Sequence, residues 1–250
     1  MPTVPGKRVT LQDVARATGY TANTVSRALK NKSDISAETC RKIQNAAREM
    51  GYVRNEMAGS LRSGQTKTLG VIVGGMSNPY YGRMTDDIQD AATEEGYSLL
   101  IFCSRDDPEL EYRLMETAIS RQVDGILLFP CRGSQPTIDR LKAVGIPYVL
   151  MARYLREGQD DCVICDEEKG AYLATKHLLE AGRHPAFLNS YDVVFSSEQR
   201  RAGFLRACSE AGLSSEQCPV AVGPADESIR RQLLKWQAQG IDGLFVFCDM

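Results

Sequence analysis

From Leu69 onward, the sequence alternates between short, fully apolar runs and longer amphipathic segments. Runs that are apolar at every position, rather than at every second one, are typical of parallel strands covered on both faces. The apolar runs are "LGVIVGG", "YSLLIF", "DGILLFP", "YVLM", "AFLN" and "GLFVF". The segments between them predict helices over 80–95, 108–122, 136–144, 168–181, 197–211 and 226–239. The pattern predicts an α/β fold of parallel sheets, in which ligands bind beyond the carboxyl ends of the strands.

Charge divides the chain into a basic head and an acidic body. Residues 1–67 contain 12 Lys and Arg against 5 Asp and Glu, a net charge of +7, whereas residues 68–250 contain 18 against 27, a net charge of −9. A basic head on an acidic body suggests that the head meets a polyanion. Many solvated tails are also basic, so charge alone leaves the partner open.

The head predicts three short helices around a small core. Thr10 and Asp13 fit a capping box at the start of the first helix, and Gly19 can end it in a left-handed conformation. Thr21 can cap a second helix, and a third begins near Ser36. The core-facing positions are Leu11, Val14, Ala15, Thr18, Val25, Ala28, Leu29, Ile43, Ala46, Ala47 and Met50. This spacing fits a DNA-binding helix-turn-helix, or a small helical bundle with no nucleic-acid role.

The outer face of the second predicted helix favours the DNA-binding alternative. It carries only small or hydrogen-bonding side chains: Ala22, Asn23, Thr24, Ser26 and Arg27. An asparagine suits the adenine edge and an arginine suits guanine, while Ala22 can offer only a methyl contact. Thr24 and Ser26 can reach phosphates.

The stretch "TLQDVARATGYTANTVSRALKNKSDISAETCRKIQNAAREMGYVRN" resembles the headpiece of the lac repressor (LacI/GalR) family of bacterial transcription regulators. The resemblance continues through most of the chain and implies a two-lobed body like that of a periplasmic sugar-binding protein. It implies a helix-turn-helix domain over 1–54, a hinge helix and linker over 55–67, a first effector-binding lobe over 68–165 and a second, incomplete lobe over 166–250.

The resemblance also implies how the head contacts DNA. The second helix lies in the major groove of a pseudo-palindromic operator, and a hinge helix places Leu61 in the minor groove. Carried over to this sequence, the implied DNA-binding residues are Thr10, Thr21, Ala22, Asn23, Thr24, Ser26, Arg27, Asn55, Ala58 and Leu61. Operator symmetry implies a homodimer, provided that the C-terminal region of the family is present in the protein.

For the body, the resemblance implies a small-molecule effector held between the two lobes. The implied effector-binding residues are Asn78, Tyr80, Tyr81, Arg153, Ser196, Arg200 and Asp249. Aromatic faces suit sugar or purine rings, and a guanidinium can bind neighbouring hydroxyls or a carboxylate. Two alternatives stay open: one of the tyrosines packs into its own lobe, and Arg200 forms a salt bridge between the lobes.

Three positions depart from the sugar-responsive pattern of the family. Ala152 and Arg153 follow the fourth strand where an aspartate is usual, Ala225 replaces an aromatic residue, and Cys248-Asp249 replaces an Asn-Asp pair. An acceptor, a stacking face and an amide are lost together. We therefore expect a sugar phosphate or sugar acid in place of a plain neutral hexose, or no effector.

The sequence contains no motif for catalysis, a cofactor or a metal. G-x-G-x-x-G, G-x-x-x-x-G-K-[ST] and G-x-S-x-G are all absent. The eight cysteines are scattered, and Cys162 and Cys165 form a lone C-x-x-C without further ligands nearby. We expect free thiols in a reducing compartment, no cofactor and no metal. Without an apolar run of membrane-spanning length or a signal peptide, a cytoplasmic location is expected.

The sequence thus predicts a sequence-specific DNA-binding transcriptional repressor, not an enzyme, controlled by a small molecule. Members of the family extend further beyond "GLFVFCDM", so we expect an open sheet edge in this chain. The alternative function is a ligand-binding module, or a non-functional truncated product, whose head binds DNA weakly.

Overall fold

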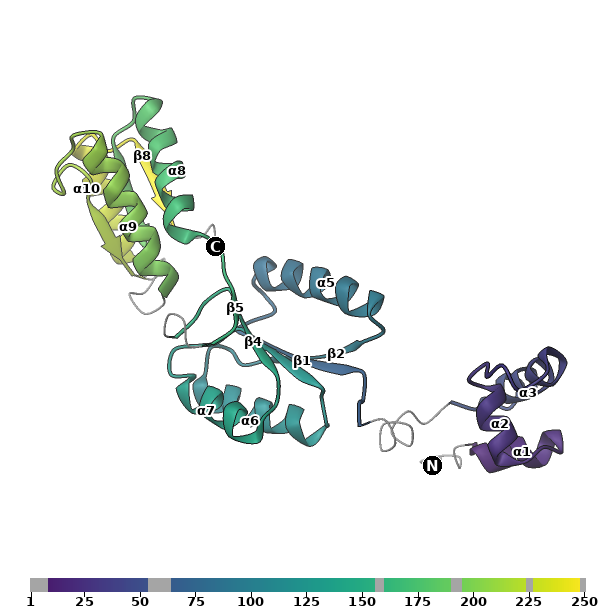
Figure 1. Cartoon of the computed structure of the whole chain (residues 1–250). Coiled ribbons are helices and arrows are strands. Elements are labelled where there is room, and N and C mark those ends of the chain that lie inside the picture. Colours follow the sequence, from purple (N-terminus) through teal and green to yellow (C-terminus); the bar gives the residue numbers. More distant parts are fainter. Residues whose placement is uncertain (1–8, 54–63, 156–159, 190–194, 224–226, 248–250) are drawn as a thin grey trace, which may run out of the picture. The chain divides into compact units, whose positions relative to one another are not determined.

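A computed structural model describes residues 9–53, 64–155, 160–189, 195–223 and 227–247 (Figure 1). The chain divides into two compact units, Met1–Thr66 and Lys67–Met250. Four of the predicted site residues lie outside the described residues: Asn55, Ala58, Leu61 and Asp249.

In its described residues, 9–53 and 64–66, the first unit contains three helices where the sequence predicts them. They are α1 (Leu11–Thr18), α2 (Ala22–Ala28) and α3 (Ala37–Glu49). The predicted capping box is present, because the Thr10 side chain accepts from the Asp13 backbone N–H and the Asp13 carboxylate accepts from the Thr10 N–H. Gly19 ends α1 with a φ of 75°, a left-handed conformation that glycine adopts without strain. The Thr21 hydroxyl caps α2 as expected.

A small apolar core joins the three helices. Its buried members are Val14, Ala15, Val25, Ala28, Cys40, Ile43 and Ala47. Val25 and Ala28 point from α2 toward this core. Because α2 buries only one face, its opposite face is accessible to solvent or to a partner.

The second unit begins with a five-stranded parallel sheet. Its strands are β1 (Thr68–Val73), β2 (Ser98–Cys103), β3 (Gly125–Leu128), β4 (Tyr148–Met151) and β5 (Cys162–Val163). They are ordered β2-β1-β3-β4-β5. The chain winds outward in opposite directions from β1 and β3, so the switch point of the sheet lies between these two strands.

Helices cover both faces of this sheet, which explains its apolar strands. The helices are α5 (Pro79–Glu94), α6 (Pro108–Ser120) and α7 (Gln135–Val144). Figure 1 shows α5 on one face and α6 and α7 on the other. Ile72, Leu128 and Leu150 are buried in the cluster that contains residues of α6 and α7. Alternate residues of the same strands, such as Val71 and Met151, face α5.

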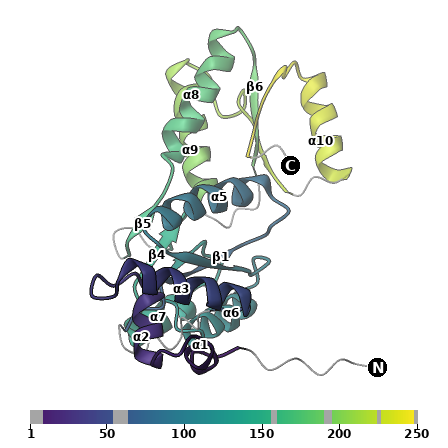
Figure 2. The ribbon, with the colours of Figure 1, turned by 90° about the vertical axis from the view of Figure 1, so that its right-hand side faces the viewer.

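A second, three-stranded parallel sheet follows. It contains β6 (Pro185–Asn189), β7 (Val220–Val222) and β8 (Gly243–Val246), ordered β7-β6-β8, so β8 is an edge strand of the described sheet. The helices are α8 (Glu167–Glu180), α9 (Phe195–Glu210) and α10 (Glu227–Ala238). Figure 2 shows α8 and α9 on one side of β6 and α10 on the other.

Helices α8 and α9 pack unusually closely through Gly203. A Cβ atom at this position would lie 2.0 Å from the backbone oxygen of Glu168. Only a residue without a side chain therefore fits at this contact. On the sheet side of α9, Phe204 packs with Phe187 and Phe245.

The predicted fold is confirmed, with every predicted helix of the body present to within two residues at each end. Strands β5 and β7 were not predicted. They contain two and three residues, too few to form an apolar run that stands out from a loop. Within the described residues, no helix is both long and apolar enough to span a membrane.

Candidate functional site

The outer face of α2 is the first candidate site. Asn23 and Arg27 are exposed, and Thr24 and Ser26 are partly exposed. These four side chains lie on the helix away from the buried Val25 and Ala28 positions. The structure thus brings together most of the predicted DNA-binding residues of the head on one accessible surface.

Three other predicted contacts of the head are already engaged within it. Ala22 is partly buried and packs against the core, so its methyl group is less available than the sequence suggested. The Thr21 and Thr24 hydroxyls lie 2.9 Å apart and hydrogen-bond to each other. The Thr10 hydroxyl donates to the Asp13 carboxylate at 2.7 Å. That hydrogen bond is the main reason why the pKa of Asp13 is lowered.

Arg27 forms an ion pair that the sequence did not reveal. Its Nε atom donates to Asp34 Oδ2 at 2.8 Å, and Nη2 lies 2.6 Å from the same oxygen. The hydrogen bond from Arg27 lowers the pKa of Asp34, so the carboxylate is ionised at neutral pH. Asp34 lies in the turn between α2 and α3, seven residues after Arg27, a separation that helical periodicity does not mark.

In the body, the loop after β1 lies at the switch point of the first sheet. Asn78 caps α5 there, and its side-chain oxygen accepts from the Tyr80 N–H at 2.8 Å. The two tyrosines that follow differ: Tyr80 is 42% exposed, whereas Tyr81 is 6% exposed and packs edge-on against Phe129. The alternative that one tyrosine packs into its own lobe thus applies to Tyr81. The Tyr81 ring packs in the apolar core, whereas its hydroxyl contacts polar groups.

The Tyr81 hydroxyl belongs to a polar cluster beyond the carboxyl ends of three strands. Arg153, after β4, donates from Nη2 to this hydroxyl at 2.9 Å, and its Nη1 lies 3.8 Å from the Asp106 carboxylate. A Cβ atom at Gly74 would lie 2.9 Å from the hydroxyl and 2.8 Å from Asp106. Gly74 therefore leaves the space into which these polar groups converge. Burial raises the pKa of Tyr81, so the hydroxyl is protonated at neutral pH.

Left-handed backbone conformations at Asp106 and directly before Arg153 position these two residues of the polar cluster. Asp106 has a φ of 54°, and Ala152, directly before Arg153, has a φ of 66°. Such angles are costly for residues other than glycine and gather at functional sites. Asp106 was not predicted, although its place directly after β2 could have suggested it.

The second sheet carries the remaining predicted effector residues at the start of α9. Arg200 donates from Nε to Glu167 Oε2 at 2.5 Å, donates to the Phe247 carbonyl, and lies over the Phe247 ring at 4.3 Å. Ser196 is 8% exposed. Arg200 forms a salt bridge with Glu167 of α8. Both residues lie in the range assigned to the second lobe, so this is not the bridge between the lobes that was expected as an alternative.

Two buried polar atoms near the start of α9 stand out. Within the described part of the chain, Asn189 Oδ1 and Ser197 Oγ have no hydrogen-bond partner. The Asn189 amide donates to the Ser197 carbonyl at 3.3 Å, which places both residues where β6 ends and α9 begins. Buried polar atoms normally have partners, so this end of the second sheet is suited to a polar ligand or to water.

Comparisons with known proteins agree with this arrangement. Residues 10–55 match the family described as "Bacterial regulatory proteins, lacI family". Residues 66–237, more than half of the chain, match "Periplasmic binding proteins and sugar binding domain of LacI family". The chain belongs to the LacI family.

Individual LacI-family proteins match along most of the chain. The "HTH-type transcriptional regulator DegA" of Bacillus subtilis is 31% identical over 89% of this chain and 64% of its own length. The "Sucrose operon repressor" of Pediococcus pentosaceus is 30% identical over 96% of this chain and 73% of its own length. The crystal structure of a LacI-family regulator from Silicibacter pomeroyi matches with a TM-score of 0.76 and 25% identity, over 97% of this chain and 74% of that one. The chain thus spans less than two thirds of the length of DegA.

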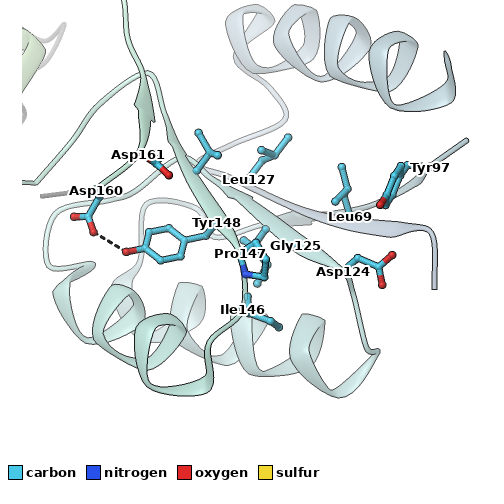
Figure 3. A pocket seen from close by; sticks show the side chains of 12 residues that line it. Leu69, Tyr97, Asp124, Gly125, Leu127, Ile146, Pro147, Tyr148, Asp160 and Asp161 are labelled. Carbon is cyan, nitrogen blue, oxygen red and sulfur yellow. Dashed lines mark hydrogen bonds between the residues drawn. The ribbon is translucent and has the colours of Figure 1, made fainter. Parts of the chain in front are cut away.

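A cavity of about 670 Å³ lies elsewhere, at the amino ends of the first-sheet strands (Figure 3). Leu69, Gly125 and Tyr148 line it, and each lies at or near the start of its strand. Tyr148 donates to Asp160 at 2.6 Å, and the Lys142 ammonium lies 2.7 Å from the same carboxylate. Open α/β sheets generally bind ligands at the carboxyl ends of their strands, and this cavity lies at the opposite ends.

The described residues contain no group of three or more His, Cys, Asp or Glu side chains placed to hold a metal ion. Cys162 and Cys165 are exposed, while Cys131 and Cys208 are buried, and burial raises the pKa of both buried thiols. Such thiols behave as small apolar side chains, as expected for free cysteines.

Proposed function

We propose that this LacI-family chain is a sequence-specific DNA-binding transcriptional repressor whose helix α2 lies in the major groove. The observation that carries the proposal is the exposed pair Asn23 and Arg27 on the outer face of α2, in a head with a net charge of +7. The two side chains are the types that hydrogen-bond to adenine and guanine edges. Relatives named as a transcriptional regulator and as an operon repressor support the same assignment.

The remaining head residues position the protein on the DNA backbone. Thr10, Thr21, Thr24 and Ser26 carry hydroxyls that can bind phosphates once their internal hydrogen bonds exchange. Ala22 offers a methyl contact. The hinge residues Asn55, Ala58 and Leu61 are proposed for the minor groove, with Leu61 as the inserted side chain.

The body is proposed to bind a small, sugar-type effector at the carboxyl ends of its strands. In the first lobe, Tyr80 supplies an exposed aromatic face, and Arg153 and Asp106 supply donors and an acceptor. In the second lobe, Ser196, Arg200 and Asp249 are the proposed contacts. Both arginines lie near carboxylates, so a sugar phosphate or sugar acid would have to displace Asp106 and Glu167 in part. Calorimetry with a neutral sugar and with its phosphate distinguishes the two classes of effector.

A pseudo-palindromic operator requires two heads, so we propose that the working species is a homodimer in the cytoplasm, without a cofactor. The test is selection of duplexes from a randomised library by the full-length protein, followed by footprinting upstream of its own gene. A repressor selects one pseudo-palindrome, with affinity that falls steeply as salt rises. If no sequence is enriched, the chain is instead a ligand-binding module whose head does not recognise DNA.

A further inference from the structure

The ion pair between Arg27 and Asp34 lies on the surface proposed to contact DNA. Their side chains are 45% and 50% exposed, so solvent screens the pair. Exposed ion pairs stabilise a fold very little, and this pair is therefore not needed for folding. The question is what a carboxylate does beside an arginine that reads bases.

The fold of the α2–α3 turn places Asp34 within reach of Arg27. The Lys32 N–H donates to the Arg27 carbonyl at 3.2 Å, and the Ile35 N–H donates to the Lys32 carbonyl at 3.1 Å. Asn31 has a φ of 49°, and its side chain accepts from Gln44 of α3 at 2.7 Å. These hydrogen bonds fix the turn independently of the ion pair.

The ion pair uses one edge of the Arg27 guanidinium and leaves another free. Nε and Nη2 both approach Asp34 Oδ2. A guanidinium has five donors in a rigid plane, so the edge formed by Nη1 and the second Nη2 hydrogen is still available. Two parallel donors of that kind match O6 and N7 of guanine. A carboxylate on the other edge restricts the rotamers of the side chain before DNA arrives.

The same carboxylate disfavours a different use of Arg27. A lysine or arginine that clamps a phosphate binds all sequences alike. Asp34 adds a negative charge directly beside the guanidinium, and this charge repels phosphate but tolerates the neutral edge of a base.

We propose that Asp34 is a positioning residue that makes Arg27 selective for guanine. The proposal rests on the proposed function, since it presupposes that α2 contacts bases. In this proposal the hydrogen bonds of the α2–α3 turn position Asp34. Asp34 in turn fixes the orientation of the Arg27 guanidinium, which contacts the base.

The test uses the full-length protein and a duplex selected by the wild type from a randomised library. Four variants are compared: Asp34→Ala, Asp34→Asn, Arg27→Ala and the double variant Arg27→Ala/Asp34→Ala. Glu49→Ala, an exposed acid at the end of α3, is the matched control for charge. The readout is the Kd on the selected duplex, on its single-base variants and on an unrelated duplex.

Arg27→Ala is expected to remove the preference for one base pair of the selected duplex. At that base pair, and at no other, we expect Asp34→Ala to lower the ratio of Kd values between the single-base variant and the selected duplex about tenfold. Binding to the unrelated duplex should tighten about twofold to fivefold at low salt, because a negative charge is removed. Asp34→Asn keeps an acceptor, so it should retain part of the base preference while showing the same gain in non-specific binding. In the Arg27→Ala background, loss of Asp34 should no longer change base preference.

Two results would overturn the proposal while leaving the proposed function intact. In one, Asp34→Ala and Glu49→Ala change binding alike, with base preference unchanged. In the other, Asp34→Ala weakens binding to every duplex equally. If the wild type itself selects no sequence, the proposed function fails instead, and that outcome is seen before any variant is made.

Discussion

Arg27 in the head and Arg200 in the body are both predicted to meet a ligand, and both contact a carboxylate. Their surroundings differ. The Arg27–Asp34 side chains are 45% and 50% exposed, whereas those of Arg200 and Glu167 are 25% and 14% exposed. Arg200 also donates to the Phe247 carbonyl and lies over its ring. The first pair leaves an arginine accessible on the surface of the head, while the second joins helices α8 and α9.

This difference teaches that residue type does not by itself separate a ligand contact from a structural one. An exposed ion pair costs little to open or to share with DNA. When one partner of a largely buried ion pair is removed, the other charge stays buried and unpaired, and this destabilises the fold. We therefore expect changes at Arg200 to lower the stability of the body in addition to any effect on effector binding, and changes at Arg27 to act on DNA binding alone.

The largest effect is expected where α8 and α9 touch. Gly203→Ala places a Cβ atom 2.0 Å from the Glu168 oxygen, so the helices must separate, and we expect a loss of about 3 kcal/mol in the free energy of unfolding. Urea unfolding followed by circular dichroism measures it. The control is Gly170→Ala in α8, where a Cβ would meet nothing within 4 Å and should stabilise by up to about 1 kcal/mol. Equal effects of the two substitutions would contradict the close contact.

The next effect concerns Arg200 itself. Arg200→Ala leaves the Glu167 carboxylate without its partner, and we expect a loss of about 1.5–3 kcal/mol in the free energy of unfolding. Arg201→Ala, at the exposed neighbouring position, should leave unfolding unchanged. Arg27→Ala should likewise leave the melting temperature near that of the wild type. A destabilisation by Arg27→Ala as large as that by Arg200→Ala would remove the distinction between the two pairs.

A smaller effect depends on pH. Burial opposes ionisation of Asp160, but hydrogen bonds from Lys142 and Tyr148 outweigh it and lower the pKa of Asp160. Because the folded pKa lies below the unfolded value of about 3.9, this group stabilises the fold above about pH 4, and the contribution is lost as pH falls through the folded pKa. We expect Asp160→Asn to cost about 1–2 kcal/mol at neutral pH and progressively less in acid.

Unfolding of the wild type and Asp160→Asn across the acid range measures the effect. The pKa of Asp34 is also lowered, but its pair with Arg27 is exposed, so Asp34→Asn serves as the control. Its unfolding curve should follow that of the wild type at every pH. A constant difference between Asp160→Asn and the wild type would show that Asp160 does not titrate with folding.

The sequence predicts the helices and strands of the chain better than it predicts the contacts of the candidate sites. Local signals suffice for the head helices, because Thr10, Asp13 and Gly19 act within a few residues of one another. Apolar runs suffice for six of the strands, but β5 and β7 form only because neighbouring strands offer them partners. The candidate sites depend on contacts over longer separations. Arg153 meets Tyr81 across 72 positions, which no local pattern marks.

The family resemblance indicates which residues belong to the sites, but not how exposed they are or which side chains they contact. It indicates two neighbouring tyrosines, yet only the packing against Phe129 shows that Tyr81 is buried while Tyr80 is exposed. It indicates Arg27, yet not the carboxylate beside it. The same resemblance gives no sign of Asp106, whose left-handed backbone conformation brings it near Arg153.

The central claim is that the outer face of α2 reads base edges through Asn23 and Arg27. The most direct test is the Kd of the wild type and of Arg27→Ala on the duplex selected by the wild type and on an unrelated duplex, at one fixed salt concentration. The account predicts that Arg27→Ala loses about 5-fold to 150-fold on the selected duplex and little on the unrelated one. An equal loss on both duplexes would show that Arg27 only binds phosphate, and would contradict the account.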